Sequence, residues 1–360
     1  MYVVTGIAAS MISYASGQSR NLEIFLQAAR DVLAGSDLYV STAFKYSPAF
    51  AFLFAPFLWI PPWLAAALWG TVNFVSAFYG IDAVVKDPRE KRIALTAALF
   101  GIVLVTDGDQ SNLLITGTML LSFQALEDGK PWRAAWLTAL GTIVKLFPAL
   151  GLAFVVFDRR RARAAPAFLL FLAGLCLSPL LALAPTTLTM EYASWRRLLS
   201  REANENRGWS MMGVLDEGLH LAVPNAWVQG AGALVLAAPF VRALLRGSDG
   251  RQRLGLMASL LAFIVLFNHR SEYATLVISA VALGVWYATG ARTRLHTLLL
   301  VLALVLPGPL YTVADPKLSG LSAFLGAPRR FHALRIVPLL GAWLWMQKDL
   351  LWPAPRRGLT

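Results

Sequence analysis

The sequence predicts an all-α polytopic membrane protein with about 12 transmembrane helices, several of them short or broken. Of its 360 residues, 57% are hydrophobic and 14% are charged, and the mean hydropathy is +0.59. A soluble domain of this size usually carries about a quarter charged residues. Apolar runs recur along the whole chain, and a helix satisfies every backbone amide within such a run.

The candidate spans are separated by short polar segments. In chain order they are 1–15, 48–60, 63–84, 93–105, 112–126, 132–157, 168–183, 227–245, 254–267, 274–288, 297–311 and 336–351. Several are shorter than the roughly 20 residues of an upright span. Short helices that end at polar clusters are tolerated where the cluster faces protein or a water-filled cavity. The spacing therefore indicates a cavity at membrane depth.

Two spans are expected to be irregular. Prolines bound the run 48–60, which favours a re-entrant segment. The run 132–157 contains a lysine and a proline at 145–148, where we expect it to break and cross twice as two half-helices. The first run lacks a basic segment and a cleavage site, so it indicates a short or truncated first span, with a true start upstream of Met1 left open. Both termini are then expected inside.

The net charge of +12 fits basic cytoplasmic loops better than nucleic-acid binding. We expect the cytoplasmic loops at 86–92, 158–163, 242–253, 292–294 and 356–357. The chain then forms one integral membrane domain, 1–360, with a first outer loop at 18–47, a short outer turn at 107–112 and a large outer loop at 186–225. Part of the large loop, 188–199, has the pattern of an amphipathic interfacial helix.

The single cysteine and the absence of a visible repeat argue against a metal site and against a transporter. Cys176 lies in an apolar run without metal-ligand spacing around it, which is typical of a small buried hydrophobe. No metal site and no cofactor are expected. No internal repeat is visible, so a transporter or flippase built from two halves is not supported.

Two basic residues at membrane depth are the strongest functional candidates. Lys145 lies in the segment IVKLFP, and a lysine between apolar residues is costly unless it pairs or faces water. Arg270 lies in NHRSEY, where a guanidinium offers a rigid fork for phosphate. A lipid phosphate is the natural partner for both. Pairing of Arg270 with the nearby Glu272 is the simpler structural explanation.

Further polar clusters flank the other apolar runs. Glu23, Gln27, Arg30 and Asp31 follow helical spacing, as one wet helix face does. Lys45 and Tyr46 lie in FKYSP and are typical of interfacial anchors. The turn DGDQSN contains Asp107, Asp109, Gln110 and Asn112, whose carboxylates and amides suit hydroxyl-rich ligands such as sugars.

Four motifs in order resemble glycosyltransferase family 87. They are FKYSPAFAFLFAP at 44–56, DQSNL at 109–113, IVKLFP at 143–148 and NHRSE at 268–272, with GSDLY at 35–39 before them. The family comprises polyprenyl-phosphate-mannose-dependent α-mannosyltransferase-like proteins of the C superfamily. The resemblance runs from about residue 21 to residue 287. It implies a multi-span fold, a cavity open to the outer face, and inverting transfer of a sugar from a polyprenyl phosphate.

The resemblance also implies roles for the polar residues. The donor phosphate and lipid would meet Lys145, Arg270, Tyr46 and Lys45. The sugar would meet Gln110, Asn112, Asn268 and Glu272. Inverting transfer needs a general base on the acceptor hydroxyl.

The base is the point at which this chain departs from the family. Family members place an aspartate in the first outer loop, at a position that aligns with Asn21. An amide cannot act as a general base. Glu23, Asp107 or Asp109 are the candidates to replace it, and Asp31 and Asp37 remain open.

Three functions follow from these observations. The first is a mannosyltransferase-like membrane enzyme at the outer face of the bacterial inner (plasma) membrane, with a polyprenyl-phosphate sugar and membrane lipid as partners and no nucleic acid. The second, motivated by Asn21, is a catalytically inactive relative that serves as a lipid-binding subunit with a protein partner. The third is a transporter or flippase, motivated by the charged residues at membrane depth.

Overall fold

The structure of the chain is a computed structural model that describes residues 1–39, 43–105, 109–203, 208–307 and 334–353. These residues form helices joined by turns, and none of them lies in a strand. The all-α class is thereby confirmed. The chain divides into two compact units, one formed by 1–84 and 107–205, the other by 85–106 and 206–360. Each unit is described by itself.

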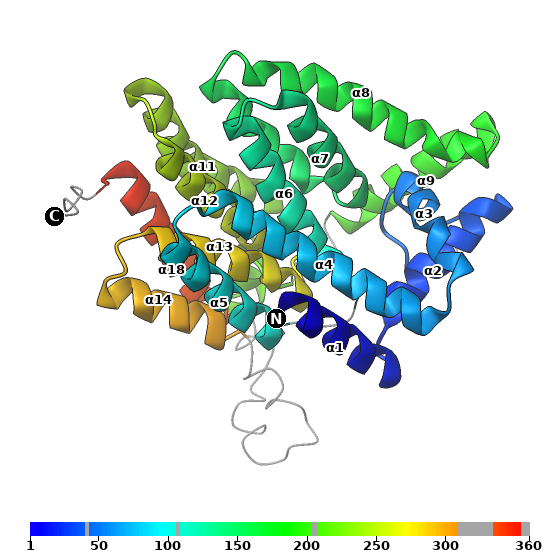
Figure 1. Cartoon of the computed structure of the whole chain (residues 1–360), viewed down its shortest axis with the longest axis horizontal. Coiled ribbons are helices and arrows are strands. Elements are labelled where there is room, and N and C mark those ends of the chain that lie inside the picture. Colours follow the sequence, from blue (N-terminus) through cyan, green and yellow to red (C-terminus); the bar gives the residue numbers. More distant parts are fainter. Residues whose placement is uncertain (40–42, 106–108, 204–207, 308–333, 354–360) are drawn as a thin grey trace. The chain divides into compact units, whose positions relative to one another are not determined.

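The first unit contains a set of packed helices around α4, α6 and α7 (Figure 1). Its elements are α1 (Tyr2–Ala15), α2 (Arg20–Ala34), α3 (Pro48–Phe54), η1 (Ala55–Trp59), α4 (Pro62–Val84), α6 (Asn112–Glu127), α7 (Pro131–Val144), η2 (Phe147–Phe157), η3 (Arg161–Arg163), α8 (Ala164–Leu177), η4 (Ser178–Leu181) and α9 (Pro185–Glu202). Small residues let α4 approach its neighbours closely. A Cβ at Gly70 would lie 2.0 Å from the Ser10 hydroxyl of α1, as expected where membrane helices pack backbone to backbone.

The second unit is built on the pair α5 and α13, with α12, α14 and α18 beside them. Its elements are α5 (Pro88–Val105), α10 (Met211–Gly213), η5 (Val214–Gly218), α11 (Asn225–Arg246), α12 (Gly250–Leu266), η6 (Tyr273–Thr275), α13 (Leu276–Thr289), α14 (Arg294–Val305) and α18 (Val337–Leu351). Small residues again form the contact, since a Cβ at Gly284 would lie 2.8 Å from the Ala94 carbonyl oxygen.

The predicted break in the run 132–157 is confirmed. Helix α7 ends at Val144, Lys145 is extended (φ −144°, ψ 145°), and the 3-10 helix η2 begins at Phe147 with Pro148 in its first turn. Proline at this position lacks the N–H that would continue the α-helix. The break therefore places Lys145 between two helical segments.

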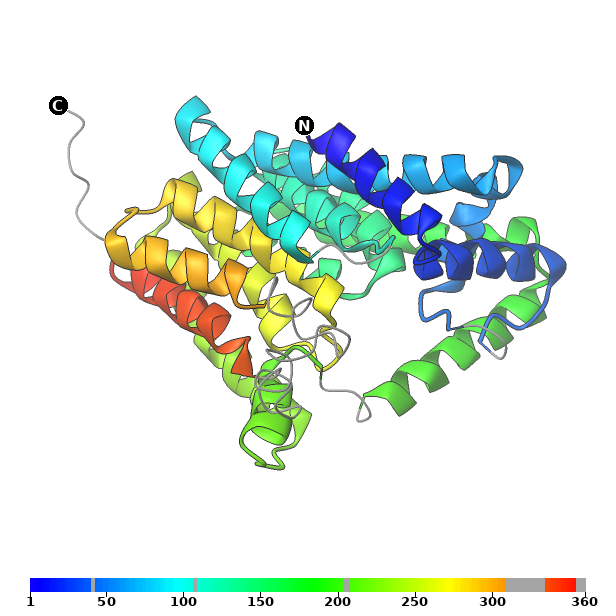
Figure 2. The same ribbon diagram turned by 90° about the horizontal axis from the view of Figure 1, so that it is seen from below.

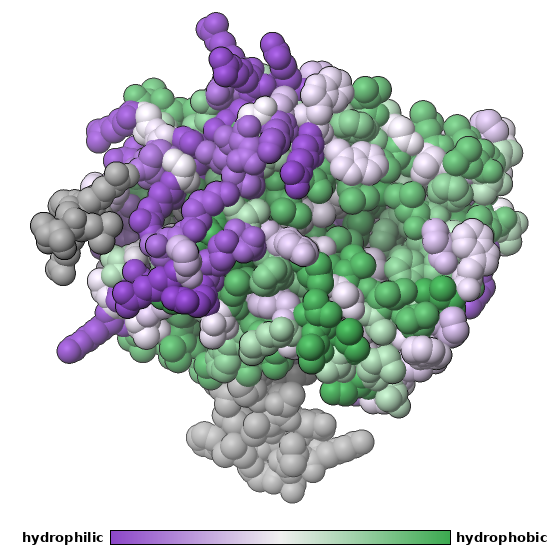
Figure 3. Space-filling view, in the orientation of Figure 1, coloured by the Kyte–Doolittle hydropathy of each residue, from purple (hydrophilic) through white to green (hydrophobic). Residues whose placement is uncertain are grey.

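Three helical segments of the described chain are long and apolar enough to cross a membrane. They are Pro62–Val84, Arg161–Leu181 and Asn225–Arg246. Other apolar helices are shorter, among them α1 and α14. The count of about 12 spans is thus not confirmed and stays a prediction. Broad apolar areas on the surface fit a lipid environment (green in Figure 3). Leu169 and Leu234 are among the large apolar side chains that are exposed.

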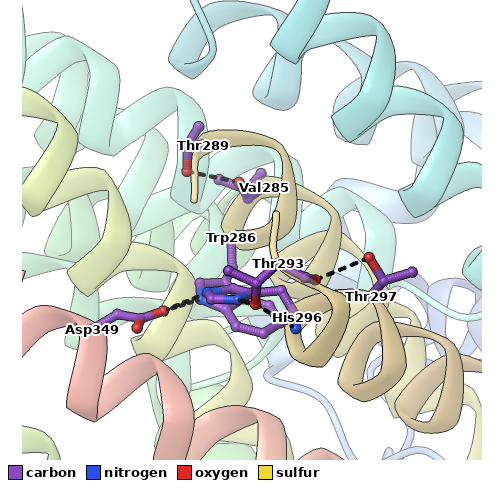
Figure 4. A network of polar contacts seen from close by, with 7 residues as sticks. All are labelled: Val285, Trp286, Thr289, Thr293, His296, Thr297 and Asp349. Atoms are coloured by element: carbon purple, nitrogen blue, oxygen red, sulfur yellow. Dashed lines mark hydrogen bonds and ion pairs between the residues drawn. The ribbon is translucent and has the colours of Figure 1, made fainter. Parts of the chain in front are cut away.

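A polar network joins three helices of the second unit (Figure 4). His296, which is 3% exposed, places Nδ1 2.6 Å from the Thr293 hydroxyl and Nε2 3.0 Å from the Asp349 carboxylate. The Trp286 indole N–H donates to the same Asp349 oxygen at 3.3 Å, and its ring stacks on the imidazole. The network fastens α13, α14 and α18 together because each helix supplies a partner to the buried imidazole.

The close contact between α4 and α6 makes Gly117 intolerant of a side chain. A Cβ there would lie 2.3 Å from the backbone carbonyl group of Ser76, so Gly117→Ala should lower the free energy of unfolding by about 1–3 kcal/mol. Gly174→Ala in α8 is the matched control, because its Cβ would meet no atom within 4 Å. Denaturation of both variants in detergent tests this. Equal stability of the two variants would contradict the packing described.

Candidate functional site

Lys145 lies at the centre of a polar group in the first unit. Its ammonium donates a hydrogen bond of 2.7 Å to the Asn112 side-chain oxygen. It also lies 5.8 Å from the centre of the Tyr46 ring, within the range of a cation–π contact. The side chain is half-buried. A cation in such a place needs partners because its transfer from water is costly.

The turn before α6 supplies two more members of this group. The Tyr46 hydroxyl donates to the Gln110 side-chain oxygen at 3.5 Å. Asn112, at the first position of α6, is 1% exposed. The three motifs FKYSP, DQSN and IVKLFP therefore meet in space. Tyr46, Gln110, Asn112 and Lys145, all predicted site residues, are brought together, and we call these four the Lys145 cluster.

Local hydrogen bonds explain why the three segments meet. Ser47 caps α3 by accepting the Phe50 N–H at 3.2 Å, and its hydroxyl donates to the Ile143 carbonyl in the last turn of α7. This contact fixes the segment with Tyr46 beside the break that carries Lys145. The Trp69 indole of α4 donates to the Asp109 carbonyl at 2.8 Å. Asn73, one turn along α4, accepts the Leu114 N–H at 3.0 Å, so α4 holds the DQSN turn.

An aromatic core lies beside Tyr46. Phe25 of α2 is fully buried and meets Tyr46, Phe50 and Trp69 edge to face, with ring centres 5.0–5.8 Å apart. Such arrangements are the favoured ones for aromatic pairs. The apolar face of α2 is thus anchored against the segment that carries Tyr46.

Asp109 points to a different place from its neighbour Gln110. It is 3% exposed, and burial raises the pKa of its carboxyl above the ordinary value. The hydroxyls of Ser19 and Ser10 lie near enough to offset part of that rise, although neither carboxylate oxygen has a hydrogen bond of good geometry to a described residue. Ser19 is the N-cap residue of α2. The carboxyl therefore lies close to the start of that helix.

The other two candidate bases are not in the Lys145 cluster. Glu23 is exposed in the first turn of α2. Gln27 and Arg30 share its exposed face, as their spacing predicts. No contact among the described residues joins Glu23 to the cluster. Asp107 lies outside the described residues.

Lys45 is held by α9 rather than by the cluster. Its ammonium forms an ion pair of 2.9 Å with Glu202, and its carbonyl accepts the Trp195 indole N–H at 3.0 Å. The adjacent residues Lys45 and Tyr46 thus have separate partners. The role of Lys45 toward the donor stays a prediction.

The NHRSE turn lies in the second unit. Asn268 accepts the Arg270 N–H at 3.1 Å, while Glu272 caps the helix η6 in a capping box with Thr275. The Tyr273 hydroxyl donates to the Leu104 carbonyl of α5 at 2.8 Å. Local backbone contacts therefore involve Asn268 and Glu272, which were predicted to bind sugar. The prediction that Arg270 meets the same phosphate as Lys145 stays a prediction.

A family model for "Glycosyltransferase family 87" matches residues 44–269, more than half of the chain. The chain belongs to glycosyltransferase family 87. The match includes all four residues of the Lys145 cluster. It begins after Asn21 and Glu23 and ends before Arg270 and Glu272. No curated protein matches the chain.

Membership of this family makes the protein a membrane glycosyltransferase.

The structure also places polar residues near the segment of Tyr46 that the sequence motifs did not reveal. Glu191 of α9 is 5% exposed and accepts the Leu38 N–H at 3.2 Å. Burial raises the pKa of this carboxyl. The Tyr39 hydroxyl donates to the Tyr46 carbonyl at 2.8 Å. The helical spacing of Leu188, Glu191 and Trp195 is the sequence signal that could have predicted Glu191 on the inner side of α9. Among the described residues, no three His, Cys, Asp or Glu side chains form a group that could hold a metal ion.

The raised pKa of Asp109 makes stability depend on pH. A carboxyl group whose pKa is higher in the folded than in the unfolded state binds more protons when the protein is folded. The contribution of Asp109 to the free energy of unfolding is therefore present below the ordinary pKa of 3.8, and it is lost as pH rises through the folded pKa. Asp109→Asn should therefore be more stable than the wild type at neutral pH. The gain in the free energy of unfolding should grow as pH rises through the folded pKa, because the amide has no charged form to be desolvated. Thermal denaturation from acid to neutral pH measures this.

Asp87 offers a control of opposite sign. Backbone N–H groups of Glu90 and Arg89 donate to its exposed carboxylate and lower its pKa. Its contribution to stability is thus present above pH 3.8 and lost as pH falls through the lower, folded pKa. Asp87→Asn should lose stability at neutral pH. If Asp109→Asn behaved in the same way as Asp87→Asn, the description of Asp109 as a disfavoured buried anion would be wrong.

Proposed function

We propose that this glycosyltransferase moves a mannose-like sugar from a polyprenyl-phosphate donor to an acceptor at the outer face of the bacterial inner membrane, with inversion at the anomeric carbon. The observation that carries the proposal is Lys145 in the break between α7 and η2, held by Asn112 and lying over the Tyr46 ring. The family membership supports the reaction class. The donor, the sugar and the side of the membrane are parts of the proposal.

The leaving group explains why a cation is needed. In the transfer, the acceptor oxygen forms a bond to the anomeric carbon while the bond from that carbon to the phosphate oxygen breaks. The phosphate leaves with the electron pair and gains negative charge. A positioned ammonium stabilises that charge most strongly where water is scarce. Lys145 is half-buried and oriented by Asn112, as this role requires.

Amide side chains suit the sugar. Gln110 and Asn112 offer both donors and acceptors to hydroxyl groups, and both belong to the Lys145 cluster. A sugar bonded to a phosphate at Lys145 would thus meet them first. Arg270 is proposed as a further contact of the donor phosphate, and Asn268 and Glu272 are proposed as further contacts of the sugar.

The base takes the proton of the acceptor hydroxyl as the new bond forms. Asp109 is next to Gln110 in the chain but is buried, whereas Glu23 is exposed but contacts no member of the Lys145 cluster. Asp107 lies two residues before Asp109 in the sequence. We propose that one of these three carboxylates is the base in place of Asn21. The family membership gives no support to the alternative of an inactive lipid-binding subunit.

Lys145→Ala should lower the rate of transfer from labelled polyprenyl-phosphate mannose by about 10²–10³-fold, the usual cost of removing one group that stabilises transition-state charge. Before the acceptor is identified, purified protein in detergent or liposomes can be assayed with water as the acceptor, and the slow hydrolysis of the donor to polyprenyl phosphate and free mannose is the readout. Lys130→Ala is the matched control, since Lys130 is exposed and pairs only loosely with Asp128 at 3.5 Å. An unchanged rate in Lys145→Ala would remove the basis of the proposal.

Substitution of each candidate base separates them. The shape of the side chain is kept in Glu23→Gln, Asp107→Asn and Asp109→Asn. The variant that lacks the true base should therefore transfer the sugar about 10²–10⁴-fold more slowly. The pH dependence of the residual activity should also lose its acidic limb, because that limb reports ionisation of the base. Retention of full activity by all three variants would show that the base is a different residue.

A further inference from the structure

Helix α9 separates its charges between two faces. Its inner side carries the buried residues Leu188, Glu191 and Glu202 together with the partly exposed Trp195, spaced as one side of a helix requires. The exposed side carries Arg196, Arg197 and Arg201. Both acidic residues of the helix are therefore on the inner side, and all three arginines are on the outer side.

The inner side is fully engaged with the segment that leads to Tyr46. Glu191 accepts the Leu38 N–H, the Trp195 indole donates to the Lys45 carbonyl, and Glu202 pairs with the Lys45 ammonium. The Lys45 ammonium neutralises the charge of Glu202, and the Leu38 N–H satisfies a Glu191 oxygen. The outer face is left with a net positive charge.

The physical surroundings of α9 limit what this outer face can meet. The helix is too polar to be among the segments that can cross a membrane, yet it belongs to a membrane protein with large apolar surfaces. A polar helix fixed to such a body lies at the level of the lipid headgroups, where cationic side chains meet phosphates. In Figure 2, α9 (green, 185–202) is a long helix at the edge of the first unit. Its three arginines are exposed.

We propose that the face of α9 formed by Arg196, Arg197 and Arg201 binds the headgroups of anionic phospholipids. Guanidinium groups bind phosphate oxygens in pairs of hydrogen bonds. Each basic residue near an anionic surface adds roughly a fivefold factor in affinity. This binding holds whether or not the proposed transfer reaction is correct, because it depends only on the charge of α9 and on the membrane.

Hydrogen–deuterium exchange measured by mass spectrometry can test α9 directly in the full-length protein. The protein is placed in nanodiscs of phosphatidylcholine alone, and in nanodiscs that also contain phosphatidylglycerol, without any donor substrate. Bound headgroups oppose the opening of the helix, so amides of residues 185–203 should exchange about fivefold or more slowly in the anionic nanodiscs. Added salt should reduce the difference by screening.

The triple variant Arg196→Gln, Arg197→Gln, Arg201→Gln should lose this lipid-dependent protection. A matched triple variant, Arg89→Gln, Arg92→Gln, Arg246→Gln, removes three exposed arginines elsewhere and should leave the response of α9 unchanged. Equal exchange of α9 in the two kinds of nanodisc, or protection retained by the α9 variant, would overturn the proposal. Protection caused by a soluble anionic polysaccharide but not by phosphatidylglycerol would overturn it too, in favour of a glycan site.

Discussion

The need to stabilise an ammonium group inside an apolar protein shapes the first unit. Lys145 can be half-buried only because the chain breaks there and an amide oxygen and an aromatic face come to it. Each partner belongs to a different segment, so the segments must all be fixed. The contacts of Ser47 with Ile143 and of Trp69 with the DQSN turn have that function. The cost of one buried charge thus accounts for polar contacts among three separate parts of the sequence.

Breaks in helices are also what make such a site chemically useful. A continuous helix uses its backbone groups internally, whereas a break exposes them to side chains. Helix α7 ends where its Ile143 carbonyl accepts the Ser47 hydroxyl, and α6 begins at Asn112 beside the ammonium. The polar groups of the Lys145 cluster therefore gather at the ends of α6 and α7. Aromatic packing around Phe25 then makes the arrangement rigid, which a precise contact with a phosphate requires.

Local sequence signals predicted the elements better than their contacts. Proline at 148 predicted the break, and the spacing of α9 predicted an amphipathic helix, because both depend on neighbouring residues. The different partners of Lys45 and Tyr46, adjacent in the chain, were not predictable, since they depend on the packing of α9. The burial of Glu191 and the exposure of Glu23 were not predictable either, because they too depend on how the helices pack. The number of spans was not fixed either, because the shorter apolar helices meet no simple length criterion.

The position of Asp109 bears on the absence of an aspartate at Asn21. Resemblance to the family places an aspartate at Asn21, in the first turn of α2, and the sequence offers only an amide there. In the structure the Asp109 side chain lies near Ser19, the N-cap residue of that same helix. Helix N-termini favour a negative charge, and Glu23 already supplies one in the first turn of α2. Asp109 brings a second carboxyl group near the same end, where burial raises its pKa. Carboxyl groups from two separate segments of the sequence therefore lie near the start of the helix that contains Asn21. Alignment along the chain alone does not reveal this relation, since Ser19 and Asp109 are brought together only by the packing of α1, α2 and α4 against the DQSN turn.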